Sequence, residues 1–290
     1  MSDPIPAGTP AAPPVGATLP MVRVRGARKT FNVGTPEEVR PMQGIDLEIP
    51  TGEFVIVLGG NGSGKSTLLN GLAGTFRLDA GSIEIDGKDV TRWPEHRRAA
   101  LVGRVFQNPF SGTAPMMTIA ENFALAARRG RSRGLGWALR ADFRDELRDR
   151  VRGLRMGLED RVDTAIGALS GGQRQALTLL MATWIEPKLL LLDEHTAALD
   201  PKSADQVIAL TDEIVSSRKL TTLMVTHAMQ QAVNLGDRIV MMHRGNVLHD
   251  VGGAAKRRLR VDDLLGRFED MRRRELLDES AASLLALAYV

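Results

Sequence analysis

The chain has 290 residues, of which 43% are hydrophobic, 38 are Lys or Arg, 35 are Asp or Glu, and none is Cys. That length suits one large domain or two small ones, and the lack of cysteine excludes disulfides, thiol catalysis and Cys-ligated metal sites. A net charge of +3 is weak support for a nucleic-acid partner, and the most apolar charge-free stretch, Gln175–Ile185, is too short for a membrane-spanning helix, which needs about 20 residues.

Residues 1–20 are predicted to form a disordered lead. They hold six of the fourteen prolines, interleaved with Ala, Gly and Thr, and have no hydrophobic period that could bury a core. They also lack the basic start and apolar centre of a secretory signal, so we expect the protein to stay in the cytoplasm. The folded domain is predicted over 21–250, followed by a helical tail over 251–290.

Short β-type runs begin at Met21. Apolar and polar residues alternate over Val22–Val24 and again over Ile45–Ile49, as in half-buried strands. Phe54–Leu58 is continuously apolar, as in a buried strand. Helical segments separate the later runs, which is the rhythm of an α/β fold with a mainly parallel core sheet. These later runs are 189–192, 223–225 and 239–242.

A glycine-rich loop directly follows the strand at 54–58, and leucines at helical spacing follow the loop. Glycines let backbone N–H groups approach phosphate oxygens, so this strand, loop and helix predict a nucleoside triphosphate site. Lys65 would reach the β- and γ-phosphates, and Ser66 would bind Mg²⁺. The loop consists of Gly59, Gly60, Asn61, Gly62, Ser63, Gly64, Lys65, Ser66 and Thr67.

A helical insert is predicted over about 108–169, where helix-forming residues and arginine predominate. Ten arginines fall within Arg128–Arg155, among several acidic residues. A basic patch is one interpretation, and a solvated helix face carrying ion pairs is the favoured one. Further along, 261–269 is predicted to be helical, and the apolar tail 284–290 is expected to pack on the core or to dock a partner.

Two adjacent carboxylates, Asp193 and Glu194, end the apolar run 189–192. Ligands bind at the carboxyl edge of such sheets. Because side chains alternate along a strand, we expect one carboxylate to point toward the Mg²⁺ shell and the other toward a water that attacks the γ-phosphate. An acidic pair can also be a surface feature, and the phosphate loop in the same chain favours the catalytic interpretation.

A second helix start, Leu169-Ser170-Gly171-Gly172-Gln173, precedes that strand. With it, residues of about 21–250 resemble the nucleotide-binding subunit of an ATP-binding cassette (ABC) transporter. The resemblance implies a P-loop NTPase fold of the ABC ATPase type, with an antiparallel β subdomain beside the parallel sheet. The motifs occur in the family's order: the phosphate loop, Gln107, 169–173, Asp193-Glu194, Ala198-Leu199-Asp200 and His227.

The resemblance also implies roles in a Mg²⁺- and ATP-dependent reaction. Phe31 matches an aromatic residue that stacks on adenine, and Gln107 would join Ser66 and Asp193 around the metal and water. Glu194 would be the catalytic base. His227 would contact the γ-phosphate and position that base. A lone Phe or His is more often a core residue, so both of these roles depend on the family match.

Ser170, Gly171, Gly172 and Gln173 resemble a signature that acts on the partner subunit. Two copies would face head to tail, with each ATP between the phosphate loop of one and the signature of the other, and Asp200 would cross the same interface. A homodimer, or a heterodimer with a second ABC subunit, satisfies this geometry. ATP would then stabilise the closed dimer, and hydrolysis would release it.

His195 and Ala197 stand where family members commonly carry Pro and Ser. The surrounding residues are similar to ATPases of bacterial importers for tryptophan, tyrosine or other amino acids. We therefore expect an ATPase that couples hydrolysis to the import of an amino acid or similar small polar solute. It would sit on the cytoplasmic face of the bacterial inner membrane.

The partners implied are transmembrane permease subunits on separate chains and, indirectly, a solute-binding protein. The permease would dock beside Gln107, where Phe110, Met116 and Met117 offer adaptable apolar contacts. A nucleic-acid-associated ABC ATPase is the main alternative, because of the arginines. Against it, each motif occurs once and no cysteine is present for a zinc module. A regulatory cassette without turnover is disfavoured by the complete set of catalytic residues.

Overall fold

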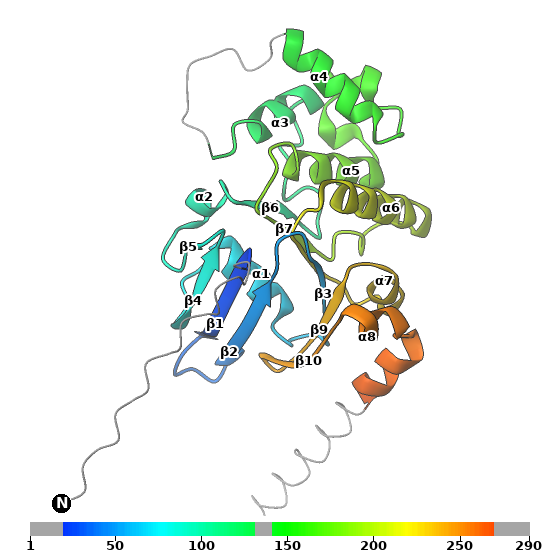
Figure 1. Cartoon of the computed structure of the whole chain (residues 1–290). Helices are drawn as coiled ribbons and strands as arrows, with labels where there is room; N and C mark the ends of the chain where they lie inside the picture. The colour runs from blue at the N-terminus through cyan, green and yellow to red at the C-terminus, as the bar shows by residue number, and fades with distance from the viewer. Residues whose placement is uncertain (1–19, 131–140, 270–290) are drawn as a thin grey trace, which may run out of the picture.

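A computed structural model of the chain describes residues 20–130 and 141–269. Most of the predicted lead and the apolar tail at 284–290 therefore lie outside the described residues. Figure 1 shows the strands in the body of the molecule, the segment with α3 and α4 at one end, and the last described helix at the other.

The larger sheet has six strands in the order β10-β9-β3-β8-β7-β6. The pairs formed by β9, β3, β8, β7 and β6 are all parallel, and only β10 pairs antiparallel with β9. The mainly parallel α/β core predicted from the apolar runs is thus confirmed. Its strands are β3 (Phe54–Leu58), β6 (Val102–Val105), β7 (Leu189–Asp193), β8 (Thr222–Val225), β9 (Arg238–His243) and β10 (Asn246–Gly252).

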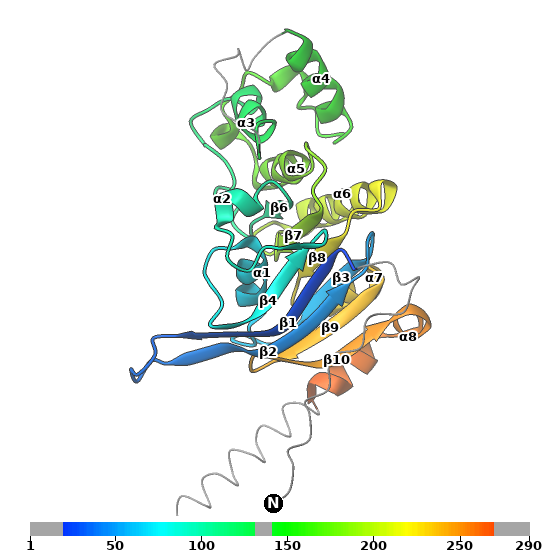
Figure 2. The same ribbon diagram turned by 60° about the vertical axis from the view of Figure 1, so that its left-hand side comes forward.

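The smaller sheet is antiparallel and has the order β2-β1-β4-β5. It is the antiparallel β subdomain that the family resemblance implied. Figure 2 shows the hairpin of β1 and β2 extending beyond the body of the molecule. Its strands are β1 (Val22–Phe31), β2 (Val39–Ile49), β4 (Ala80–Ile85) and β5 (Lys88–Asp89).

Alternating side chains of the parallel strands enter two separate cores. Val55 and Val57 of β3 pack with α1 and the antiparallel sheet, whereas Ile56 and Leu58 pack with α5, α6 and the helical segment. Both faces of the sheet are buried, which explains why its strands read as continuous apolar runs. The fold therefore holds the carboxyl ends of these strands on a rigid, covered sheet.

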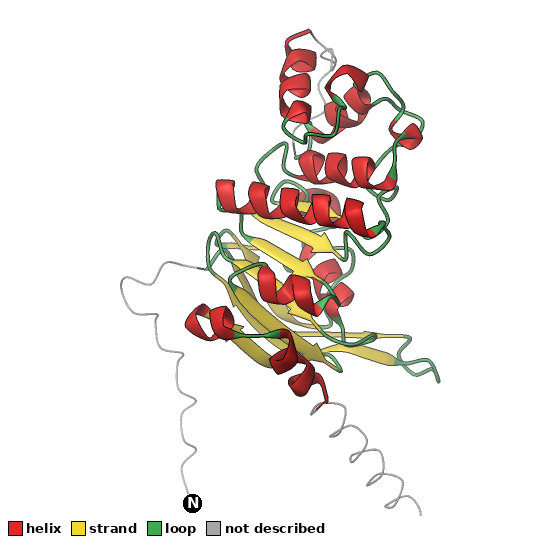
Figure 3. Cartoon of the chain, turned by 90° about the vertical axis from the view of Figure 1, so that its right-hand side faces the viewer, coloured by secondary structure: helices red, strands yellow, loops and turns green. Residues whose placement is uncertain are grey.

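Helices connect the strands and cover the sheet, as Figure 3 shows for α5 and α6. Residues 261–269 are also helical, as predicted, whereas the domain boundaries stay predictions. No described helix is long and apolar enough to cross a bilayer. The helices are α1 (Lys65–Ala73), α2 (Glu95–Arg98), α3 (Ile119–Ala126), α4 (Ala141–Arg152), α5 (Gly171–Ala182), α6 (Pro201–Arg218), α7 (Met229–Asn234) and α8 (Gly253–Arg258), with short 3₁₀ turns at Glu159–Arg161 and Ile166–Ala168.

Arginines of α4 are paired with acidic side chains. Arg148 contacts Asp145, Arg150 contacts Glu146, and Arg152 contacts Asp149, each within one helical turn. Arg144 reaches out of the helix to Asp163, at 2.6 Å. On α4 this arrangement is the solvated, ion-paired helix face that the sequence favoured over a basic patch, while Arg131, Arg133 and Arg140 lie outside the described residues.

Candidate functional site

Four neighbouring parallel strands deliver the candidate site residues to one edge of the sheet. The phosphate loop follows β3, His227 follows β8, Glu194 follows β7, and Gln107 follows β6. Ligands of open α/β sheets bind at this carboxyl edge. The topology therefore brings together residues that lie more than a hundred positions apart in the chain.

The phosphate loop needs its glycines for conformation and for space. Gly62 and Gly64 have φ of 76° and 100°, a left-handed region that other residues rarely adopt. A Cβ on Gly64 would also collide with the carbonyl oxygen of Pro41, on β2. Gly64 is the N-cap of α1, so the loop presents the helix N-terminus and its partial positive charge to the site.

Lys65 folds back over the loop that precedes it. Its Nζ donates hydrogen bonds to the carbonyl oxygens of Gly59, at 2.9 Å, and Gly60, at 3.0 Å. Burial lowers the pKa of this ammonium from its ordinary value, while Glu194 and Asp193 oppose the shift. The ammonium is held by only two neutral carbonyl groups, so an anionic phosphate in the loop would be a stronger partner.

Asp193 ends β7 beside the loop. The Ser66 hydroxyl donates to its carboxylate at 3.4 Å, and Arg104 Nη2 lies 3.5 Å from the other carboxylate oxygen. Burial raises the pKa of the Asp193 carboxyl, and the Arg104 guanidinium opposes that shift. A hydroxyl and a carboxylate suit Mg²⁺, which takes oxygen ligands and completes its shell with substrate phosphates and water. The described residues contain no cluster of three His, Asp or Glu that could hold a metal by itself.

Glu194 lies just outside the strand, with φ of 42°. The two carboxylates contact different groups, as predicted, but Glu194 is not part of the alternating strand, because β7 ends at Asp193. Gln107 Nε2 donates to Glu194 Oε2 at 3.5 Å, and His227 Nδ1 lies 3.3 Å from the same oxygen. Glu194 is thus the point where three sheet-edge loops meet.

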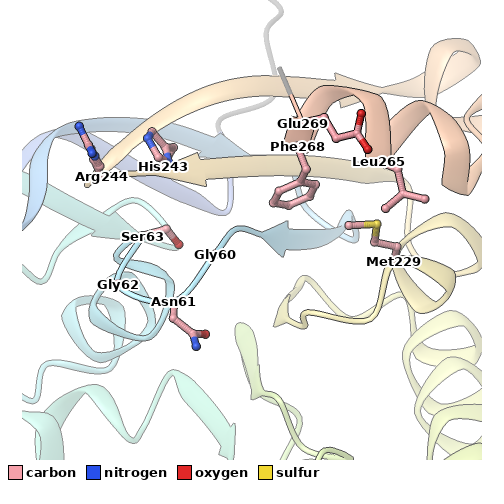
Figure 4. Close-up of a pocket in the computed structure, with 10 residues that line it drawn as sticks. All are labelled: Gly60, Asn61, Gly62, Ser63, Met229, His243, Arg244, Leu265, Phe268 and Glu269. Atoms are coloured by element: carbon pink, nitrogen blue, oxygen red, sulfur yellow. The ribbon is translucent and has the colours of Figure 1, made fainter. Parts of the chain in front are cut away.

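One pocket of about 290 Å³ is lined by the phosphate loop, Gln107 and Glu194, but not by His227 or Asp193. The loop lines one side, while Gln107 and Glu194 line the other. Beside it lies a pocket of about 560 Å³, shown in Figure 4, where the outer residues of the loop face Met229, Leu265 and Phe268. The smaller pocket is the one where the predicted phosphate loop meets Glu194, the predicted base.

Phe31 does not line the phosphate pocket. Its ring packs edge-on against Phe76, with centroids 5.4 Å apart, and Lys29 Nζ lies 5.3 Å from its centroid. Phe76 follows α1 in the chain. The structure therefore places Phe31 at the end of β1 in the antiparallel sheet, near the C-terminal end of α1.

The Ser170–Gln173 segment and Asp200 also lie outside the phosphate pocket of their own chain. Ser170 caps α5 through a capping box, in which its hydroxyl accepts from the Gln173 N–H and the Gln173 side chain accepts from the Ser170 N–H, both at 3.2 Å. Asp200 caps α6 by accepting from the Ser203 N–H. A Cβ on Gly172 would meet Ser203, so the two helix starts are packed together.

Arg104 belongs to the site but was missed in the sequence. Besides approaching Asp193, it donates to Asn70 Oδ1 at 2.6 Å and its guanidinium carbon lies 4.4 Å from the Phe106 ring centroid. It stands within β6, in no motif, and only the pairing of β6 with β7 brings it to the acidic residue. No signal in the sequence distinguishes it from the other arginines.

Comparisons with known proteins agree on one family. A family model described as ABC transporter matches residues 42–197. Over 249 residues the chain is 42% identical to the tyrosine transport ATP-binding protein of Clostridioides difficile. This alignment covers 86% of this chain and 99% of that protein. It is 37% identical to the lipoprotein-releasing system ATP-binding protein LolD of Ruegeria pomeroyi, over 79% of this chain and 97% of that protein.

A solved structure agrees with these relatives. It is a dimeric ATP-binding cassette in a post-hydrolysis state, bound to ADP and Pi. The match has a TM-score of 0.68 and 27% identity, and covers 80% of this chain and 98% of that one. The similarity therefore extends over nearly the whole of the solved cassette.

Proposed function

We propose that this chain, which belongs to the ABC transporter family, couples ATP hydrolysis to the import of an amino acid or a similar small polar solute. It is an ATPase of the ABC type. The observation that carries the proposal is the meeting of the phosphate loop, Gln107, Glu194 and His227 at one sheet edge. Import is favoured because the tyrosine transport relative is more similar than the lipoprotein-releasing one.

In the proposed reaction, the loop N–H groups and the α1 N-terminus bind the phosphates of ATP, and Lys65 exchanges its carbonyl partners for phosphate oxygens. Ser66 and Asp193, with Gln107 nearby, would hold Mg²⁺, which neutralises charge that develops on the phosphates. Glu194 accepts a proton from the attacking water. His227 and Gln107 orient Glu194 through the contacts at 3.3 Å and 3.5 Å.

The signature residues are proposed to act across a dimer. Ser170–Gln173 and Asp200 lie outside the phosphate pocket of their own chain, which fits contact with ATP held by a second copy. The related cassette bound to ADP and Pi is dimeric. Phe31 is proposed as the adenine contact from the family resemblance.

The permease is proposed to dock on an apolar groove of about 590 Å³ between β6, α3 and α5. Phe106 and Leu125 line it, and Met116 and Phe110 nearby are 93% and 46% exposed. Such apolar side chains suit a short amphipathic helix of a membrane partner. This docking would place the chain at the cytoplasmic face of the membrane, with a solute-binding protein supplying cargo on the other side.

Glu194→Gln tests the reaction. It keeps the size of the side chain and one acceptor oxygen but removes the base, so we expect ATP turnover to fall by about a hundredfold or more while ATP binding persists. ATP should then convert the variant into a stable dimer, measured by size-exclusion chromatography with light scattering.

Glu186→Gln is the matched control, because Glu186 is an exposed glutamate outside the phosphate pocket. It should hydrolyse ATP at the rate of the unchanged protein. Undiminished turnover in Glu194→Gln would show that the base is another residue.

A further inference from the structure

Two turns at the sheet edge carry the proposed catalytic pair. The turn after β7 holds Glu194 and continues through Thr196 toward α6, and the turn after β8 holds Thr226 and His227 before α7. The pair meets at 3.3 Å, between His227 Nδ1 and Glu194 Oε2. The separation of these turns therefore decides whether base and histidine touch.

The side chain of Gln231, on α7, bridges the two turns. Thr226 Oγ1 accepts from the Ala228 N–H at 3.1 Å and donates to Gln231 Oε1 at 2.8 Å. The Gln231 oxygen accepts this hydrogen bond, so the Gln231 Nε2 faces the other turn. There Nε2 donates to Thr196 Oγ1 at 3.4 Å. One side chain thus connects both turns.

Both threonines are buried. Thr196 is 7% exposed and Thr226 is 4% exposed. A buried hydroxyl that loses its partner is costly, so replacing the amide of Gln231 would favour rearrangement of the turns. The bridge is therefore a restraint on their positions.

The Glu194 turn needs such restraint. Its φ of 42° is unfavourable for a glutamate and persists only where neighbouring contacts impose it. On the α6 side, His195 Nε2 lies 2.9 Å from Thr211 Oγ1. On the α7 side, the contact to Gln231 restrains the turn. The turn is thus held from two helices.

We propose that Gln231 is a positioning residue for ATP hydrolysis, which holds the Glu194 and His227 turns together by bridging the hydroxyls of Thr196 and Thr226. The inference rests on the proposed function, since it assumes that Glu194 is the base. Gln231 does not line the phosphate pocket, so its effect should fall on turnover and not on ATP binding.

Gln231→Leu is the direct test. We expect kcat for ATP hydrolysis to fall about tenfold, with KM for ATP unchanged within about twofold, because small displacements of a catalytic group cost turnover. The matched control is Gln230→Leu on the same helix. Gln230 is exposed, bonds only within α7 to Asn234, and should leave both constants unchanged. A normal kcat in Gln231→Leu would overturn the proposal.

The other end of the bridge gives a second test that does not depend on the stability of one variant. Thr196→Val removes the hydroxyl and should also lower kcat about tenfold, while Thr196→Ser retains it and should stay near the unchanged rate. Equal rates in both variants would contradict the bridge.

Combination with Glu194→Gln separates positioning from general damage. With the base removed, Gln231→Leu should lower the residual turnover no further, because the contact between His227 and the base, which the bridge maintains, is already lost. A further tenfold loss would point to a structural defect and overturn the inference. If Glu194→Gln alone retains full turnover, the assignment of Glu194 as the base in the proposed function fails; if it is inactive while Gln231→Leu is normal, only this inference fails.

Discussion

His195 is a buried imidazole directly after the proposed base. It is 1% exposed, and its Nε2 lies 2.9 Å from Thr211 Oγ1. Thr211 already donates its hydroxyl proton to the Val207 carbonyl, so the hydroxyl must accept from Nε2–H. Nδ1 then carries no proton, and it has no hydrogen-bond partner among the residues that the structure describes. Burial lowers the pKa of His195 to about 4, and the ring stays neutral in the folded chain.

This histidine should make the fold acid-sensitive. In the unfolded chain His195 has a pKa of about 6.5, so below that pH it binds a proton. The folded chain does not bind this proton until the pH is near 4. The free energy of unfolding therefore falls as the pH drops from about 6.5 toward 4. Between pH 7 and pH 5 we expect about 2 kcal/mol of this loss. Denaturant unfolding of the unchanged protein and of His195→Gln at both pH values measures it. An equal loss in the two proteins would show that His195 does not titrate in this way.

Single residues differed in how well the sequence identified them. The phosphate loop was recognisable because its local backbone requires glycine, both for positive φ and for close approach to neighbouring backbone atoms. The left-handed backbone of Glu194 was not, because nothing in an apolar run marks the residue at which the strand ends. Arg104 and Gln231 carry no motif, and their partners come from strands and turns that only the folded chain brings together.

Among the elements, buried parallel strands were the most predictable. Continuous apolar runs marked β3, β7, β8 and β9 because both faces of the sheet are covered. The first half of β2 was not foreseen. Its residues Val39 and Arg40 are exposed and form no apolar pattern, although Val39 pairs with Phe31 of β1. Exposed arms of a hairpin leave little signal in the sequence.

The groove between β6, α3 and α5 gives a prediction about transport. Met116→Asp places a charge on a side chain that is 93% exposed, so the fold and ATP binding should persist while permease docking is lost. Solute uptake by cells expressing the variant should fall by about tenfold or more. Leu248→Asp is the control, since Leu248 is 46% exposed on β10, away from the groove. Unchanged uptake in Met116→Asp would remove the assignment of this surface.

At the scale of the whole molecule, each ATP site is proposed to need two chains. Glu194→Gln damages the base of a site, and Ser170→Arg damages the signature offered to the partner. Each variant alone should be inactive as a homodimer. A mixed dimer contains one site with both defects and one with none, so activity should reappear on mixing.

The expected recovery follows from random pairing. In an equal mixture half the dimers are mixed and each has one intact site, which gives about a quarter of the unchanged ATPase rate. The measurement is phosphate release against mixing ratio, after nucleotide binding has shown that both variants are folded. Activity that stays at the level of the separate variants would mean that the signature serves its own chain.

At Glu194 the backbone conformation and the proposed chemistry favour different residue types. A φ of 42° favours Gly or Asn, while the chemistry proposed there requires a carboxylate. The fold alone would therefore favour Gly or Asn at this position, whereas the proposed turnover favours glutamate. The position is one of stability–activity trade-off, where the residue best for the enzyme is not the residue best for the fold.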